Sequence, residues 1–96
     1  MLDKLTVDDF KSLLGATFRA AVGDGEVVTL QLDSAENLPA GGGPRKPFAL
    51  LFTGSAQFPL IQQIYTLEND TLGQLDIFLV PVGETDGTRE YEAVFN

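Results

Sequence analysis

The spacing of apolar residues predicts one short helix near the start of the chain. Between residues 7 and 14 the apolar positions recur at helical spacing and would share one face. Thr6 is a good N-cap residue, Asp9 follows it at the spacing of a capping box, and Gly15 is typical of a helix end. A helix of two turns is marginal alone, so its apolar face must dock on the rest of the protein.

Beyond Gly15 the pattern changes to period-two alternation or short continuous apolar runs, both typical of strands. Strands are predicted over residues 17–22, 26–32, 48–54, 60–67, 72–82 and 89–95. The Gly-Asp-Gly sequence at 23–25 indicates a turn, and the Asp-Gly pair at 86–87 favours a primed hairpin turn. Pro81 cannot donate a ladder hydrogen bond, so it marks a strand end, an edge or a bulge. We expect the final strand to pair with residues 74–80.

Three segments between these strands are predicted to be irregular. Residues 33–47 contain three prolines and three consecutive glycines, which disfavour regular structure. Residues 54–60 form a second irregular connection, and residues 68–70 form a turn. A loop as long as 33–47 is either a flexible connection or a functional segment.

Six short strands separated by turn signals predict a mainly β protein. The expected fold is a small antiparallel six-stranded barrel or curled sheet. The single short N-terminal α-helix would plug one open end or pack across one face. A length of 96 residues indicates a single domain over residues 1–96.

The charge balance argues against nucleic acid and anionic membranes as partners. Six basic residues stand against fourteen acidic ones, a formal net charge of −8, and the only adjacent basic pair is Arg45-Lys46. No apolar run approaches the roughly 20 residues that a membrane helix needs. The first ten residues lack the apolar region of a secretory signal. We therefore expect a cytoplasmic protein.

The chain contains no cysteine, histidine or tryptophan. It therefore has no disulfide framework, no thiolate zinc site, and neither the commonest general base nor the commonest transition-metal ligand. We expect no cofactor and no bound metal. Catalysis would have to depend on carboxylates, lysine or tyrosine.

Asp76, Glu90 and Glu92 are the carboxylates best placed to act together. If the last hairpin closes at residues 86–87, all three could lie on one outer face, and paired carboxylates can perform acid–base chemistry when one pKa is raised. The alternative, which the pattern favours, is a charged strand face that prevents edge-to-edge aggregation.

Two loop motifs resemble ligand sites only in part. Residues 68–70 (Glu-Asn-Asp) could offer oxygens to Ca²⁺, but their spacing is not that of an EF-hand loop, and an ordinary turn is favoured. The glycines at 41–43, followed by Pro44, Arg45 and Lys46, lack the spacing of a phosphate-binding loop. A flexible loop with two exposed cations is favoured there.

Aromatic residues are candidates for a core or for a binding site. One set could either fill the barrel interior, which is favoured, or line a ligand cavity. This set comprises Phe48, Leu50, Phe52, Phe78, Tyr91 and Phe95. Tyr65 and Tyr91 should keep their hydroxyls at the rim. Phe58 stands beside a proline in a loop, so it is either an exposed anchor for a partner or tucked under the barrel.

Three segments of the sequence resemble a family of small bacterial domains of unknown function. These segments are LDKLTVDDFKSLLGATFR, KPFALLFTG and IYTLENDTLGQLDIFLVPVG…YEAVFN, in the order that family members share over nearly the whole chain. One departure is the Asn-Asp pair at 69–70, where relatives often carry His-Pro; the loop at 39–44 is variable. The resemblance implies a mainly β bacterial protein and suggests an accessory role beside phage-tail-like collar proteins.

The sequence therefore favours a non-enzymatic interaction or assembly module that presents the loops at 33–47 and 54–60 to a protein partner. Phe58, Arg45 and Lys46 are the candidate partner-binding residues. The alternative is a small-ligand binder or a carboxylate-dependent enzyme built on Asp76, Glu90 or Glu92. Self-association through a strand edge near Pro81 is a third hypothesis.

Overall fold

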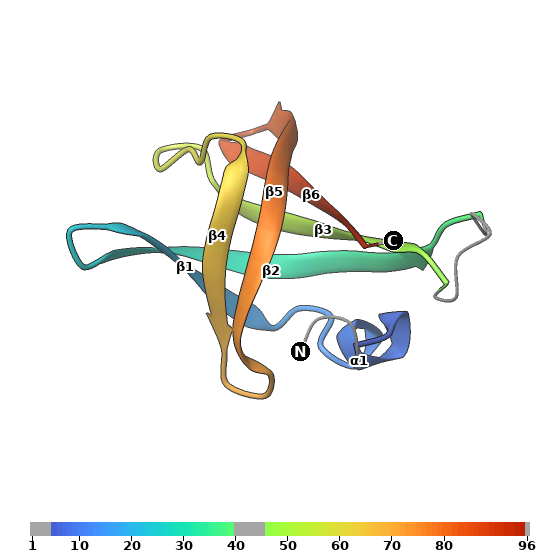
Figure 1. Ribbon diagram of the computed structural model, residues 1–96. Helices are drawn as coiled ribbons and strands as arrows, with labels where there is room; N and C mark the ends of the chain where they lie inside the picture. Colours follow the sequence, from blue (N-terminus) through green and yellow to red (C-terminus); the bar gives the residue numbers. More distant parts are fainter. Residues whose placement is uncertain (1–4, 40–45, 96) are drawn as a thin grey trace.

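The strands close into an antiparallel barrel in the computed structural model, which describes residues 5–39 and 46–95 (Figure 1). The order around the barrel is β1-β2-β3-β6-β5-β4. The predicted fold class, a mainly β six-stranded barrel with one short N-terminal helix, is confirmed for the described residues. Its elements are α1 (Val7–Lys11), β1 (Thr17–Gly23), β2 (Glu26–Asn37), β3 (Phe48–Ser55), β4 (Gln63–Asn69), β5 (Gly73–Thr85) and β6 (Thr88–Phe95).

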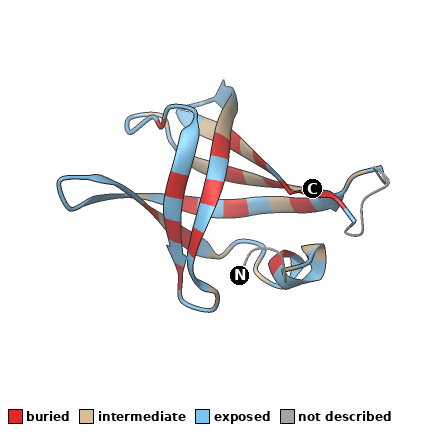
Figure 2. Cartoon of the chain, in the orientation of Figure 1, coloured by how far each residue is buried: buried red, intermediate tan, exposed pale blue. Residues whose placement is uncertain are grey.

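Along most of each strand every second residue points into the barrel, so buried and exposed positions alternate along the ribbons (Figure 2). This alternation follows from the pleat of a strand, which sends successive side chains to opposite faces. Large side chains fill the interior; those that are fully enclosed include Phe18, Leu30, Leu32, Phe52, Leu67, Ile77, Leu79 and Tyr91. The barrel therefore contains a packed core.

The helix α1 closes one end of the barrel with Phe10. This ring is fully buried and lies 5.8 Å from the ring of Phe48 and 5.7 Å from that of Phe95, measured between centroids. The Thr6 backbone N–H donates to the Asp9 carboxylate at 2.8 Å, as the predicted capping box requires. Capping thus holds the short helix in place while its aromatic anchor joins the core.

The helix ends at Lys11, which is three residues earlier than the apolar spacing predicts. The backbone N–H of Gly15 donates to the Leu32 carbonyl at 2.8 Å, so the following residues are drawn toward the edge of β2. Gly15 adopts the left-handed conformation, with φ of +83°, that allows this change of direction. Leu14 is exposed as a result, although it was expected on the buried face.

Strand β2 continues to Asn37, so the first five residues of the segment predicted to be irregular, 33–47, belong to the sheet. A bulge at Asp33 shifts the pairing with β3 between Leu32 and Ser34. The bulge restores the inward direction for Ala35, which is buried. Pairing with a strand distant in sequence therefore extends β2 beyond its predicted end at residue 32.

Strand β5 pairs with two different neighbours along its length. Residues 73–79 pair with β4, and only the part from Val80 to Thr85 pairs with β6. The expected pairing of the final strand with residues 74–80 therefore holds only at Val80, and it is wrong for residues 74–79. The predicted Asp-Gly turn is confirmed, with φ of 50° and 82° at residues 86–87, and the pairing shifts beside Pro81 as in a bulge.

Strand β4 is displaced along the chain relative to its prediction. It begins at Gln63 rather than at residue 60, and it includes Glu68 and Asn69, which were expected in a turn. The partner strand explains this difference, because β5 offers matching positions only from Leu79 back to Gly73.

The barrel closes between β1 and β4 through a ladder of only two residue pairs. These pairs are Arg19 with Glu68 and Ala20 with Leu67. Beyond them the strands diverge, because β1 continues with β2 into a hairpin that projects away from β4 (Figure 1). Val22 lies on this projecting part and is exposed.

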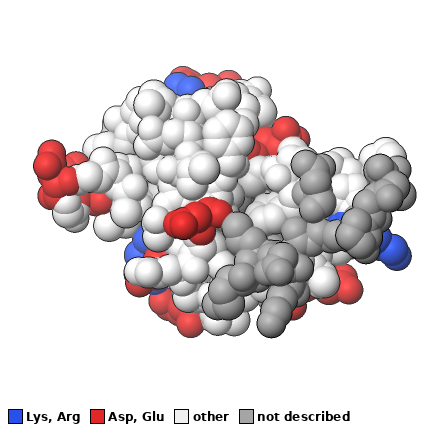
Figure 3. Space-filling view, viewed as in Figure 1, with Lys and Arg blue, Asp and Glu red and all other residues white. Residues whose placement is uncertain are grey.

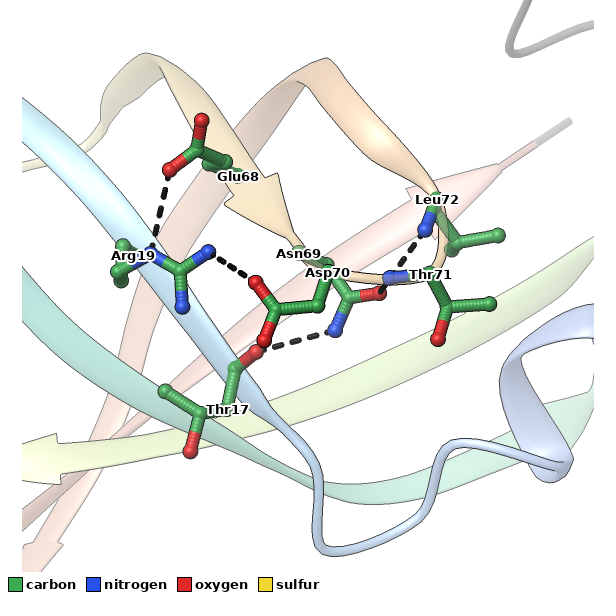
Figure 4. A network of polar contacts seen from close by, with 7 residues as sticks. All are labelled: Thr17, Arg19, Glu68, Asn69, Asp70, Thr71 and Leu72. Atoms are coloured by element: carbon green, nitrogen blue, oxygen red, sulfur yellow. Dashed lines mark hydrogen bonds and ion pairs between the residues drawn. The ribbon is translucent and has the colours of Figure 1, made fainter.

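Side-chain hydrogen bonds extend this short closure at the end away from the hairpin (Figure 4). The buried amide of Asn69 donates to the Thr17 carbonyl at 3.0 Å. Its carbonyl oxygen accepts from the backbone N–H groups of Thr71 and Leu72, at 2.9 and 3.0 Å. One side chain thus satisfies three backbone groups where the strand ladder ends.

Arg19 joins the two strands on the outer surface beside Asn69 (Figure 4). Its Nη2 lies 2.8 Å from Asp70 Oδ1, and its Nε lies 3.2 Å from Glu68 Oε1. Hydrogen bonds to Asp70 and to Glu68 raise the pKa of Arg19 above its ordinary value. Oxygens of all three residues considered as Ca²⁺ ligands, 68–70, therefore have partners within the protein.

Replacing Asn69 by Ala is expected to lower the free energy of unfolding by about 1–3 kcal/mol, because three backbone groups lose their partner. Urea-induced unfolding followed by circular dichroism measures the change. Asp70→Ala is the matched control, since its carboxylate is exposed and its ion pair is weakened by water, so it should cost much less. Equal losses for the two variants would contradict the closing role of Asn69.

Replacing Phe10 by Ala is expected to cost about 3–5 kcal/mol, because it removes a fully buried ring from the aromatic cluster. Thermal and urea unfolding measure this loss. Leu14→Ala, from the same segment, serves as the control and should change stability by less than about 0.5 kcal/mol, since Leu14 is 51% exposed. Similar stabilities of the two variants would show that α1 is not part of the core.

Candidate interaction surface

The connection between β3 and β4, residues 56–62, crosses the barrel end opposite α1 and is tied to two core tyrosines. The backbone N–H of Leu60 donates to the Tyr91 hydroxyl at 3.0 Å. The Tyr65 hydroxyl donates to the Ile61 carbonyl at 2.8 Å. Both hydroxyls therefore bond to backbone groups of this connection and fasten it to the core.

The anchored connection leaves two large apolar side chains outside the core. Leu60 is buried, whereas Ile61, the next residue along, is 69% exposed. Phe58 is 61% exposed, which decides between the two alternatives for it: the ring is not tucked under the barrel. Exposed aromatic and aliphatic side chains on a held backbone are typical of contact residues in protein interfaces.

An apolar groove of about 350 Å³ lies between this connection and the projecting β1–β2 hairpin. It occupies the region where β1 and β4 diverge, so it results directly from the short closure of the barrel. Its lining residues are Val22, Val28, Phe58, Pro59, Leu60, Ile61, Gln63 and Tyr65.

A second apolar area adjoins the groove on the outer face of β4 and β5. Ile64 and Phe78 stand directly opposite each other on these strands and are 65% and 49% exposed. Figure 3 shows an uncharged area on the upper front of the molecule, below the charged atoms at the top of the view. Contiguous exposed apolar area of this kind commonly marks a site of contact with another molecule.

Acidic residues border the groove at the tip of the β1–β2 hairpin. Asp24 and Glu26 are exposed there, and Figure 3 shows acidic atoms at this projecting end. At the opposite side of the same barrel end, Arg89 Nη1 lies 3.8 Å from Glu84 Oε1. The hairpin side of the groove therefore presents negative charge to an incoming molecule.

Lys46, one of the two basic residues predicted to bind a partner, does not join this surface. Lys46 is exposed just before β3, at the barrel end that α1 closes. Phe58 follows β3 at its other end, so the length of that strand separates the two residues. Arg45 and the glycines at 41–43 lie outside the described residues.

The three candidate carboxylates lie on the outer surface without forming one group. Asp76 faces Thr66 across β4 and β5 and accepts a hydrogen bond of 2.8 Å from its hydroxyl. Glu90 and Glu92 lie on β6, opposite Gly83 and Val80 of β5. Among the described residues, no group of three or more acidic side chains could hold a metal ion.

The aromatic set divides between the core and the surface. The rings of Phe48, Phe52, Tyr91 and Phe95 are buried as the core interpretation predicts, whereas Phe78 points outward. The sequence left the exposure of Phe58 open between two alternatives and did not indicate the exposure of Ile61, Ile64 and Phe78. The exposure of Phe78 could have been found from the alternation along β5. Leu75, Ile77 and Leu79 share the buried face, so Phe78 falls on the opposite face.

A family model described as a domain of unknown function, DUF6916, matches residues 5–95. The chain belongs to this family. Membership in DUF6916 confirms the resemblance to a family of small domains of unknown function over nearly the whole chain. No curated protein and no solved structure is significantly similar to the chain. The DUF6916 match by itself assigns neither a reaction nor a partner.

Within residues 5–39 and 46–95, the structure contains no helix that is both long and apolar enough to cross a membrane.

Tyr65 is expected to ionise at a pH above its usual pKa of 10, because burial of the side chain raises its pKa. The folded state then favours the neutral phenol, so its contribution to stability is complete below pH 10 and is lost as the pH rises further. A ¹³C NMR titration of the Tyr65 ring, with and without urea, measures both midpoints. A native midpoint at or below 10 would contradict the buried position of this hydroxyl.

Proposed function

We propose that this domain is a non-enzymatic interaction or assembly module that binds a protein partner with the surface around Phe58. The observation that carries the proposal is the exposure of Phe58 and Ile61 on a connection fastened to the core by Tyr91 and Tyr65. The barrel would supply a stable support, and the connection would present the contact residues.

The energetic basis is the burial of side chains that are already positioned. Transferring Phe58 and Ile61 from water into an interface would contribute roughly 1–2 kcal/mol each. Because hydrogen bonds already hold the backbone of Leu60 and Ile61, less conformational entropy is lost on binding than with a free loop. The adjoining pair of Ile64 and Phe78 enlarges the apolar area available to a partner.

The biological setting that we propose follows the resemblance described for the sequence. A small bacterial, cytoplasmic module whose described residues form no grouped set of reactive side chains would suit an accessory role beside phage-tail-like collar proteins. In that role the domain would act by contact with another protein, and it would require no cofactor.

A small-ligand binder is the second candidate, and the groove favours it. A volume of about 350 Å³ is at the lower end of the range of small-molecule sites. The lining is apolar, with the polar groups of Gln63 and Tyr65 among its members, so an apolar molecule with few polar atoms would fit best. The Tyr65 hydroxyl is already bonded to Ile61, which leaves little polar recognition for such a ligand.

Photo-crosslinking in bacterial cells tests the protein-partner proposal. Benzoylphenylalanine in place of Phe58 is expected to yield a defined covalent adduct with a second protein. The same group in place of Leu14, which is also about half exposed but lies at the α1 end, is the matched control and should not yield it. Absence of a Phe58-specific adduct, or adducts shared equally by both positions, would overturn the proposal.

A further inference from the structure

We infer that the groove binds an extended segment of the partner protein, which adds as a strand to the free edge of β4 and carries Lys or Arg next to the acidic hairpin. This inference rests on the proposed function and specifies how the partner is recognised.

The backbone of β4 has an unpaired edge along the groove. Its pairing with β1 ends at Leu67, and the described residues provide no partner on that side for the stretch 63–66. On its other side the same stretch pairs with β5, so it is held in an extended conformation. An extended edge with free N–H and C=O groups is the template on which β-strand addition occurs.

The exposed apolar side chains occupy both faces next to this edge. Residues of an added strand that point inward would meet the groove, whose lining includes Tyr65, Leu60 and Phe58. Residues that point outward would lie beside Ile64, which stands opposite Phe78. Because side chains alternate along a strand, one added segment would cover both apolar areas at once. An apolar extended segment is therefore the occupant that accounts for both exposed areas.

The negative charge beside the groove favours a basic partner over a second copy of this chain. The formal net charge is −8, and the acidic residues Asp24 and Glu26 stand at the hairpin beside the groove. A second copy would bring the same acidic hairpin to the interface, and like charges placed together oppose binding. Basic residues flanking the apolar segment would instead be attracted to this hairpin.

The free edge is only four residues long, which limits how much backbone hydrogen bonding can contribute to binding. A stretch this short offers few backbone hydrogen bonds, so much of the affinity must come from apolar contacts with Phe58 and Ile61. Both the edge and these side chains can be tested separately.

Selection from random 12-residue peptides displayed on phage tests the chemistry of the occupant. Peptides enriched on the full chain are expected to contain an apolar run flanked by Lys or Arg. Their affinity should fall about tenfold or more for the Phe58→Ser/Ile61→Ser variant and stay unchanged for Leu14→Ser. Circular dichroism and urea unfolding verify that the variants keep the fold, so a loss of binding is not a loss of structure.

N-methylation of the best peptide tests strand addition itself. Methyl groups on alternate backbone nitrogens form two sets, and pairing with one edge uses only one of them. One set is expected to weaken binding about tenfold or more and the other much less. Amide hydrogen exchange should slow, when the unmodified peptide binds, at those residues of 63–66 whose N–H groups point away from β5.

Several outcomes would overturn the inference. They are the absence of enriched peptides, enrichment of acidic or helix-patterned peptides, equal effects of both methylated sets, and a concentration-dependent dimer of the chain that blocks the groove. A Phe58-specific crosslink together with any of these results would leave the proposed function in place and remove only strand addition. Failure of the crosslink would instead remove the proposed function.

Discussion

Closure of the barrel between β1 and β4 is the constraint on which the rest of the structure depends. Two residue pairs form the entire ladder, and the buried amide of Asn69 extends it by bonding to the Thr17 carbonyl. Arg19 adds exposed ion pairs, which contribute less because water screens them. The other neighbouring strands pair over longer stretches, so the β1–β4 pairing is the shortest in the barrel.

The same joint creates the candidate interaction surface. Because β1 leaves β4 after Ala20, the hairpin projects and an apolar groove opens between it and the connection at 56–62. The hydroxyls of Tyr91 and Tyr65 bond to the backbone of that connection, and Phe58 stays exposed outside the core. A longer β1–β4 ladder would bury this region and leave no free edge on β4. The groove is therefore accessible because the ladder that closes the barrel is short.

Features that depend on neighbouring residues could be predicted from the sequence. The capping of α1, the Asp-Gly turn at 86–87, the inward positions of β5 and the bulge near Pro81 all have local causes. Of the residues of the candidate surface, the sequence indicated only Phe58 as a possible exposed contact, because it stands beside a proline in a loop. The exposure of Ile61 and Ile64 could not be predicted, because an isoleucine in a strand-like run is ordinarily a core residue.

The sequence by itself determined the class of the fold, the places where the chain turns and the faces of most strands, since propensity, turn geometry and alternation act over a few residues. The tertiary structure decided where strands end and which strands pair. It extended β2 to Asn37, divided β5 between two partners and ended α1 at Lys11. The physical reason is that backbone hydrogen bonds and apolar burial between residues distant in the chain outweigh the weak local preferences at the ends of each element.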